Sequence, residues 1–528
     1  MRINNWLIIL VLFAFIIRII PISFPDFTSD EARVAYRAFA LSSTGKDELG
    51  RSYPLLFNST VDYQLPVVSY ITSLGVLVFG KTDLGVRLPF MLIGTVVVFL
   101  AYQLSKFFVQ DKRFNLYSAF LTSLSPGLVF FSKFPNEYIV SVFLILILVL
   151  LVLKERLSLP LILGIILLML LTSKMMWFIL FPVLLLTLLL NKKINRKKII
   201  LYAASGLVPA VVIIYLYLSI SQGIRSLMEN NFPIIFDVTI KNGIEKLRSQ
   251  ESLWWPYFLD RMLFNKAYFV IVGFFHWFSA LNFSTLFGEL DYTGSFGFLK
   301  QGALPKLAIV PFLMGLTALI REKQRLKLLL LYVLIVSLPM VFLYPNQNAG
   351  FIILVLPFVI LISALGLKLF NHKIVVMFFV ILVLEFVVNL WFIQATVKKA
   401  NHYRQGWIKQ VIQEADDYAS NYKIAFSDNL TEDIVPFIEW YTRFRPEKGY
   451  ENIKLPYKFH QTRISNLKLL VSENTFKICD SDPPTYIFAS ERDFNKIQKY
   501  IRVLPKKIYK NYLGEDTVYL ILPKVCIY

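Results

Sequence analysis

The chain has 528 residues, of which 56% are hydrophobic and only 17% are charged, and its 55 basic and 35 acidic residues give a net charge of +20. Soluble globular proteins carry about 25% charged residues, so this composition excludes an ordinary cytosolic enzyme, a disordered chain and a collagen. We interpret the basic excess as membrane topology rather than as a nucleic-acid surface, because cytoplasmic loops of membrane proteins collect Lys and Arg.

Apolar runs close to the ~20 residues that a spanning helix needs recur along the first three quarters of the chain. Eleven of them lie near 5–24, 87–108, 115–132, 138–153, 158–173, 175–190, 199–220, 303–320, 326–343, 351–370 and 373–393. No small-x-small cleavage site follows the first run, so residues 1–24 are predicted to be an uncleaved signal anchor.

A further apolar run, 64–80, decides the topology. If it does not cross the membrane, the short basic loops, including 192–198 and 321–327, all fall on one side. The positive-inside rule then predicts eleven spans, a cytoplasmic N-terminus, and 64–80 as a helix on the outer membrane face. The alternative is twelve spans with an inverted start.

This topology predicts a polytopic α-helical domain, 1–393, with outer loops at 25–86 and 221–302, and a tail, 394–528, outside the membrane. Short β-like runs in the tail alternate with helical ones, which predicts a small extracytoplasmic α/β domain. The β-like runs are 422–427, 467–472, 485–489 and 517–522, and the helical runs are about 405–420, 431–443 and 492–502. Cys479 and Cys526 lie in this tail, either as a disulfide or as two free thiols.

Two adjacent carboxylates, Asp30 and Glu31, follow the first span directly. Thr28 or Ser29 can cap a helix that begins here, and acids in its first turn would then stabilise the helix dipole. A second charged group outside the membrane, Lys133 with Glu137, reads either as a functional pair or as a surface ion pair of little worth.

An ordered set of motifs begins at these carboxylates. It comprises Asp30-Glu31-Ala32, Tyr36, Thr44-Gly45, Pro54, Pro66, Phe79-Gly80, Val86-Arg87-Leu88-Pro89, Leu124-Ser125-Pro126, Ser132-Lys133 with Glu137, Leu286-Phe287-Gly288-Glu289 with Gly302, and Leu338-Pro339. Over residues 1–370 the set resembles the GT-C membrane glycosyltransferases. More narrowly, it is similar to the bacterial dolichyl-phosphate-mannose–protein mannosyltransferases and their aminoarabinose (lipid A) transferase relatives.

The resemblance implies an enzyme of the bacterial-type inner membrane with interfacial helices in its first outer loop. Such an enzyme moves a hexose or pentose, with inversion, from a polyprenyl-phosphate carrier to a hydroxyl of a lipid, protein or glycan outside the membrane. An inverting displacement needs a base for the acceptor proton and cations for the departing phosphate.

The family's acidic position falls on Asp30, which is therefore the candidate base. Glu31 points about 100° away on a helix and is expected to orient the site. Lys133, Arg87 and Lys174 are candidate phosphate ligands, with Glu137 beside Lys133; Arg87 can equally snorkel to native headgroups.

No metal cofactor is expected, because no Asp-x-Asp pair accompanies Asp30 and Glu31, although their oxygens can hold a divalent cation. A secondary transporter or lipid flippase is the competing class, and it would place charges near the bilayer centre. The acid within a span, Glu385, is expected to pair with Asn389. A surface-polysaccharide polymerase or ligase shares this layout but would use a lipid-diphosphate donor.

Overall fold

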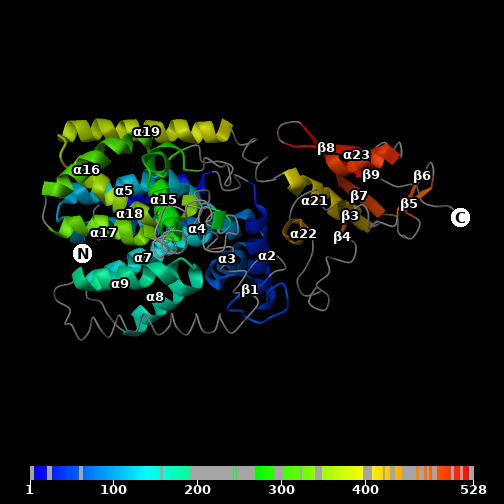
Figure 1. The fold of residues 1–528 in the computed structure, drawn as a ribbon, viewed down its shortest axis with the longest axis horizontal. Helices are drawn as coiled ribbons and strands as arrows, with labels where there is room; N and C mark the ends of the chain where they lie inside the picture. The colour runs from blue at the N-terminus through cyan, green and yellow to red at the C-terminus, as the bar shows by residue number, and fades with distance from the viewer. Residues whose placement is uncertain are drawn as a thin grey trace. The chain divides into compact units, whose positions relative to one another are not determined.

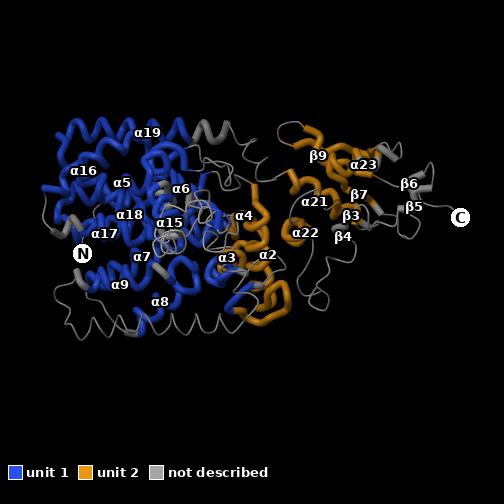
Figure 2. The backbone as a smooth tube through the Cα atoms, in the orientation of Figure 1, with its two compact units in different colours: residues 1–22, 55–71, 87–391 blue, residues 23–54, 72–86, 392–528 orange. Residues whose placement is uncertain are grey.

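The computed structural model describes residues 5–20, 26–58, 63–154, 159–190, 242, 245–246, 268–290, 301–321, 324–338, 340, 348–395, 407–419, 423–427, 434–442, 459–462, 469–472, 475–478, 485–500, 505–511 and 515–521. The chain forms two compact units, shown in Figure 2. Unit 1 comprises 1–22, 55–71 and 87–391, and unit 2 comprises 23–54, 72–86 and 392–528. Unit 2 thus joins two parts of the first loop to the tail.

Unit 1 is built from helices (Figure 1). They are α1 (Asn5–Ile19), α4 (Asp83–Phe108), α5 (Lys112–Leu124), α6 (Pro126–Phe131), α7 (Glu137–Leu153), α8 (Leu159–Thr172), α9 (Met176–Leu190), α15 (Tyr268–Ala280), the π-helix η2 (Ser284–Gly288), the 3-10 helix η3 (Lys306–Ala308), α16 (Ile309–Arg321), α17 (Gln324–Ser337), α18 (Asn348–Leu367) and α19 (His372–Ala395). A short ribbon, β1 (Phe57–Asn58) with β2 (Tyr63–Gln64), completes the unit.

Three of the described helical segments are long and apolar enough to cross a membrane: Asp83–Phe108, Gly350–Leu367 and His372–Asn389. Six shorter apolar helices accompany them. The total of eleven spans stays a prediction, and its run at 199–220 lies outside the described residues.

The run at 64–80 forms α3 (Pro66–Phe79), a helix of 14 residues. At 1.5 Å per residue it is ~21 Å long, shorter than the ~30 Å hydrocarbon core of a bilayer. Leu74, Leu77 and Val78 on its second half are exposed. These properties suit the interfacial helix predicted here, and its place on the outer face stays a prediction.

The buried centre of unit 1 is α18, which runs through the middle of the helices in Figure 1 and packs against α16 and α17. Glycines let two of these helices touch through their backbones. A Cβ on Gly315 of α16 would overlap the carbonyl oxygen of Ile362, and one on Gly366 of α18 would overlap that of Pro311. Close approach at small residues supplies van der Waals packing between membrane helices. By contrast, α19 lies along one edge and leaves most of its apolar side chains exposed.

Glu385 of α19 holds the beginning of η3. Its Oε1 accepts a hydrogen bond from the backbone N–H of Lys306 at 2.7 Å, and its Oε2 accepts one from Leu307 at 3.4 Å. The predicted partner of Glu385 is therefore wrong, because these contacts come from N–H groups at a helix start and not from Asn389. Free N–H groups at a helix start are strong donors for a carboxylate.

Unit 2 contains a mixed five-stranded sheet. Its strands are β3 (Lys423–Ser427), β4 (Phe459–Thr462), β7 (Thr485–Ser490), β8 (Lys507–Lys510) and β9 (Asp516–Ile521), in the order β4-β3-β7-β9-β8. The β3 strand pairs in parallel with β4 and β7, whereas β9 runs antiparallel to β7 and β8.

The helices of this region are α21 (Trp407–Tyr418), α22 (Val435–Tyr441) and α23 (Glu491–Tyr500), and β5 (Leu469–Ser472) pairs with β6 (Thr475–Ile478). The predicted strands and helices of the tail are confirmed, with bounds that differ by a few residues; β4, β6 and β8 were not predicted. Cys479 and Cys526 lie outside the described residues.

The first loop contributes α2 (Ser29–Thr44) to unit 2, where it packs on α22. Phe27, just before α2, stacks on Trp440 with ring centroids 5.8 Å apart. Lys81, in the turn between α3 and α4, donates hydrogen bonds to the carbonyls of Glu439 at 3.1 Å and Thr442 at 2.9 Å. Lys81 therefore satisfies carbonyls at the C-terminal end of α22, and burial lowers its pKa to about 8.

Candidate active site

The acidic motif opens α2. Thr28 caps the helix, because its Oγ1 accepts a hydrogen bond from the backbone N–H of Glu31 at 3.2 Å. The side chain of Asp30 is 76% exposed and lies 3.1 Å from Nη1 of Arg33, whereas Glu31 is only 2% exposed. Successive residues on a helix point in different directions, so one acid faces outward and its neighbour faces the packed side.

This arrangement separates what the two acids can do. The exposed carboxylate of Asp30 can meet a hydroxyl and accept its proton, and its i,i+3 contact with Arg33 is the kind of surface pair that is worth little. Glu31 is enclosed by the packing of α2, and its expected role in orienting the site stays a prediction.

The Thr44-Gly45 motif ends the same helix. Gly45 has a φ of 69° and donates its backbone N–H to the carbonyl of Leu41, the usual left-handed cap. A Cβ there would come within 2.8 Å of the Tyr53 hydroxyl. Beyond it, the Arg37 guanidinium, buried in α2, binds Glu48 at 2.5 Å and ties the following turn to the helix.

A basic group gathers in unit 1 at the turn between α6 and α7. Lys133 in this turn is 8% exposed, Arg87 near the start of α4 is 1% exposed, and Arg18 in the last turn of α1 is wholly buried. The Lys133 ammonium donates a hydrogen bond to the carbonyl of Ile20 at 2.7 Å. Burial, followed by the charges of Arg18 and Arg87, lowers the pKa of Lys133 to about 8. We call Arg18, Arg87 and Lys133 the basic cluster.

Sequence reasoning named Arg87 and Lys133 but missed Arg18. The only signal was a basic residue inside an apolar run, which also fits simple snorkelling at a span end. The structure shows a different position. Nη1 of Arg18 donates to the carbonyl of Ala14 at 2.9 Å, and Nε and Nη2 have no hydrogen-bond partner in the described part of the chain.

Glu137 and Lys174 take other positions. Glu137 is the first residue of α7, whose cap Asn136 accepts hydrogen bonds from the N–H groups of Tyr138 and Ile139 at 3.0 Å each. An acid in that turn stabilises the helix dipole. Lys133 precedes the cap, so it does not share a helix with Glu137 as an i,i+4 pair requires. Lys174 is half-buried in the turn between α8 and α9.

Two sequence motifs that are far apart in the chain meet at the start of α6, the helix that precedes the turn with Lys133. Ser125 donates its hydroxyl to the carbonyl of Ala303 at 2.8 Å, and the N–H of Gly127 donates to the same oxygen at 3.1 Å. Gly302 is needed because a Cβ there would lie 2.5 Å from the backbone of Phe287. The Leu124-Ser125-Pro126 and Leu286–Gly302 motifs thus fix the start of α6, which leads into Lys133.

Among the described residues, no three His, Cys, Asp or Glu side chains gather as metal ligands would. The expectation that no metal is required stays a prediction.

Comparisons with known proteins give a match to one family model and matches to solved structures. Residues 64–218 match the model of the dolichyl-phosphate-mannose-protein mannosyltransferase family. A comparison with curated proteins finds no match. The crystal structure of ArnT from Cupriavidus metallidurans bound to undecaprenyl phosphate matches with a TM-score of 0.53 at 13% identity, over 98% of each chain.

The apo form of that protein gives a TM-score of 0.52 at 12% identity, again over 98% of each chain. The oligosaccharyltransferase AglB from Archaeoglobus fulgidus, in complex with an inhibitory peptide and a dolichol-phosphate, gives 0.47 at 13% identity, over 92% of this chain and 69% of that one. In sequence over residues 64–218, and in the ArnT-like fold of nearly its whole length, the chain therefore resembles the GT-C membrane glycosyltransferases.

Proposed function

We propose that the protein is an inverting glycosyltransferase that moves a sugar from a polyprenyl-phosphate carrier to an acceptor hydroxyl on the outer face of the membrane. The observation that carries the proposal is the buried cations Arg87 and Lys133, in a chain whose fold is similar to that of a protein crystallised with undecaprenyl phosphate. Buried cations bind phosphate strongly because the surroundings screen them little.

Asp30 is assigned as the general base. In a single displacement the acceptor oxygen attacks the anomeric carbon, the bond from that carbon to the phosphate oxygen breaks, and Asp30 takes the acceptor proton. Glu31 supports α2 from its packed side. Glu137 and Lys174 are assigned weaker roles near the donor, and this displacement needs no metal.

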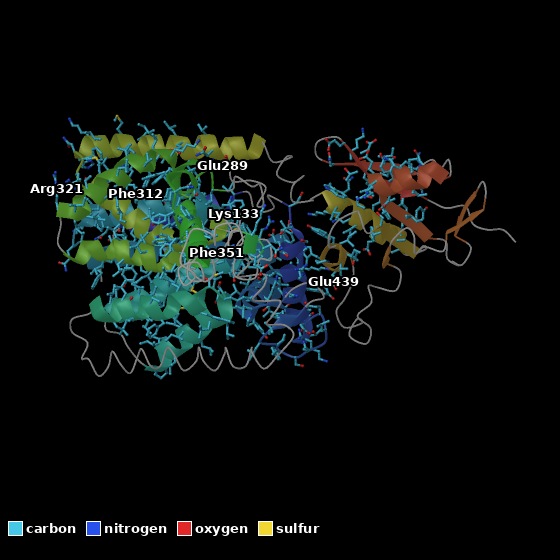
Figure 3. All side chains as sticks on the ribbon, viewed as in Figure 1. Lys133, Glu289, Phe312, Arg321, Phe351 and Glu439 are labelled. Atoms are coloured by element: carbon cyan, nitrogen blue, oxygen red, sulfur yellow. The ribbon has the colours of Figure 1, made fainter. Side chains whose placement is uncertain are left out.

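The outer-face assignment follows from charge. The basic loops at 192–198 and 321–327 are placed in the cytoplasm by the positive-inside rule. Figure 3 places Arg321 and Lys133 toward opposite ends of unit 1. The proposed phosphate ligand then belongs at the outer headgroup level, with the N-terminus inside and the C-terminal α/β domain outside.

The test is transfer by the purified full chain in nanodiscs. A panel of radiolabelled polyprenyl-phosphate hexoses and pentoses, with one polyprenyl-diphosphate sugar, is offered together with envelope lipids, glycans and peptides. We expect one monophosphate donor to lose its sugar to an acceptor, and Asp30→Asn to stop the loss. Use of the diphosphate donor alone would indicate a polymerase or ligase. Carrier movement without bond cleavage would indicate a transporter.

A further inference from the structure

We propose that Arg18 is a third ligand of the donor-phosphate site, and that this site favours the departing polyprenyl phosphate over the arriving donor. The inference rests on the proposed function and adds a residue and a preference to it.

Arg18 is the least satisfied large polar side chain described in unit 1. It is wholly buried, one nitrogen bonds the carbonyl of Ala14 in its own helix, and two nitrogens have no hydrogen-bond partner among the described residues. Burying a guanidinium with unmade hydrogen bonds is costly unless an anion completes them. The planar fork of an arginine matches two oxygens of a phosphate.

The surroundings place Arg18 with the other two cations. The Lys133 ammonium binds the carbonyl of Ile20, two residues after Arg18, and both Arg18 and Arg87 act on its charge. Gly94 of α4 makes room for this meeting, since a Cβ there would lie 3.0 Å from Nε of Arg18 and would overlap Ser132. Three elements thus bring positive charge together: α1, α4 and the turn after α6.

Counting charge through the reaction gives the preference. The donor is a phosphodiester with one negative charge. When its bond to the sugar breaks, the electron pair stays on the phosphate oxygen, the sugar goes to the acceptor oxygen, and the acceptor proton goes to Asp30. The leaving group is a phosphate monoester with a charge of about −1.5 to −2. A cationic site gains attraction as this charge develops, which lowers the barrier.

The experiment measures binding of two probes to the full chain in nanodiscs: undecaprenyl phosphate, and its sugar phosphodiester. Wild type should bind the monoester more tightly. Arg18→Met should weaken monoester binding on the order of tenfold or more, the scale of a lost charge-assisted contact, and weaken diester binding less. Arg18→Lys keeps the charge but loses the planar fork, so its affinity for the monoester should lie between those of wild type and Arg18→Met.

Two further variants sharpen the result. Gly94→Ala pushes on the guanidinium without removing its charge, and it should also weaken the monoester selectively. Arg321→Met removes an exposed arginine from the far end of unit 1 and should leave both affinities unchanged (Figure 3).

The possible results test the proposed function, the role of Arg18 and the preference for the leaving group separately. If wild type binds neither lipid, the proposed function fails. If wild type binds both and Arg18→Met leaves the monoester affinity unchanged, only the role of Arg18 is overturned. An equal loss for both probes overturns the preference for the leaving group. If Arg18→Met does not fold, Arg18→Lys carries the same comparison, and an unchanged affinity ratio there overturns the inference.

Discussion

The candidate base and the basic cluster differ most in their exposure to solvent. Asp30 stands on an open helix face beside Arg33, whereas Arg18, Arg87 and Lys133 are buried among the helices of unit 1. The acceptor hydroxyl must be able to reach the base in more than one orientation. Cations, by contrast, act more strongly on a phosphate where the dielectric constant is low. Substitutions of the candidate base and of the basic cluster should therefore impair the protein in different ways, and this contrast can be measured.

The largest expected effect is that of Asp30→Asn. Asparagine keeps the size of the side chain but cannot take a proton, so single-turnover transfer should fall by ~10²–10⁴-fold. Because Asp30 is exposed, the melting temperature should stay unchanged. Near-normal turnover would remove Asp30 as the base.

Glu31→Gln is its matched partner on the same helix. Glu31 is buried, so this change should lower the melting temperature more than Asp30→Asn does, with a smaller loss of turnover. A reversed pattern, with Glu31→Gln abolishing transfer in a folded protein, would exchange the roles of the two acids.

The next effect is expected in the basic cluster. Arg87→Met and Lys133→Met should each lower kcat/KM for the donor by ~10–100-fold, through a higher donor KM and a lower kcat. Each variant removes a charge-assisted contact to phosphate. For Lys133 the charged form is disfavoured in the fold, as its lowered pKa indicates, so Lys133→Met should not be strongly destabilising. Acceptor KM serves as the control, and unchanged donor kinetics in both variants would contradict the assignment.

A smaller effect should appear with pH. The pKa of Lys133 is about 8, so its ammonium loses charge as the pH rises from 7.5 to 9.5. Phosphate monoesters are already fully ionised there, because their second pKa is ~6. Undecaprenyl phosphate affinity should therefore fall by up to ~10-fold across this window. Lys133→Arg stays charged and should flatten the curve. A wild-type curve that is already flat would argue against Lys133 as a ligand.

The smallest effect concerns only α2, the helix that carries the candidate base. Thr28→Ala removes the cap of α2 and should cost ~1 kcal/mol in the free energy of unfolding, whereas Thr28→Ser should retain most of it. Thermal unfolding checks this change. Transfer by the folded fraction should stay normal if the cap only stabilises the helix.

Local features of this protein could be read from the sequence. The helix that begins here, its cap by Thr28 or Ser29 and the different directions of Asp30 and Glu31 depend on neighbouring residues, and the structure has Thr28 as the cap. The strands β3, β7 and β9 follow from apolar residues flanked by polar ones. The local structure around Asp30 and Glu31 could therefore be predicted from the sequence.

The remaining features depend on contacts between distant residues. Lys133 meets the end of α1 across 113 residues, and Ser125 meets Ala303 across 178. No periodicity in the sequence specifies which buried cations share a space, which is why Arg18 was missed. The same reason explains Glu385, whose donors lie 79 residues away at Lys306, while Asn389 was merely the nearest polar residue in its own helix.

The bond between Lys81 and the carbonyl of Glu439 spans 358 residues and has a consequence for synthesis. At translation rates of about 5–20 residues per second, α2 and its flanking segment would wait ~20–70 s for α22 to be made. During that interval Phe27, Val76 and Val86 lack the apolar surface against which they finally pack. Ribosomes that stop before α22 would release chains that already carry the candidate base, on a helix without its packing partner. We expect such chains to be degraded, because cells continuously remove incompletely folded proteins with proteases.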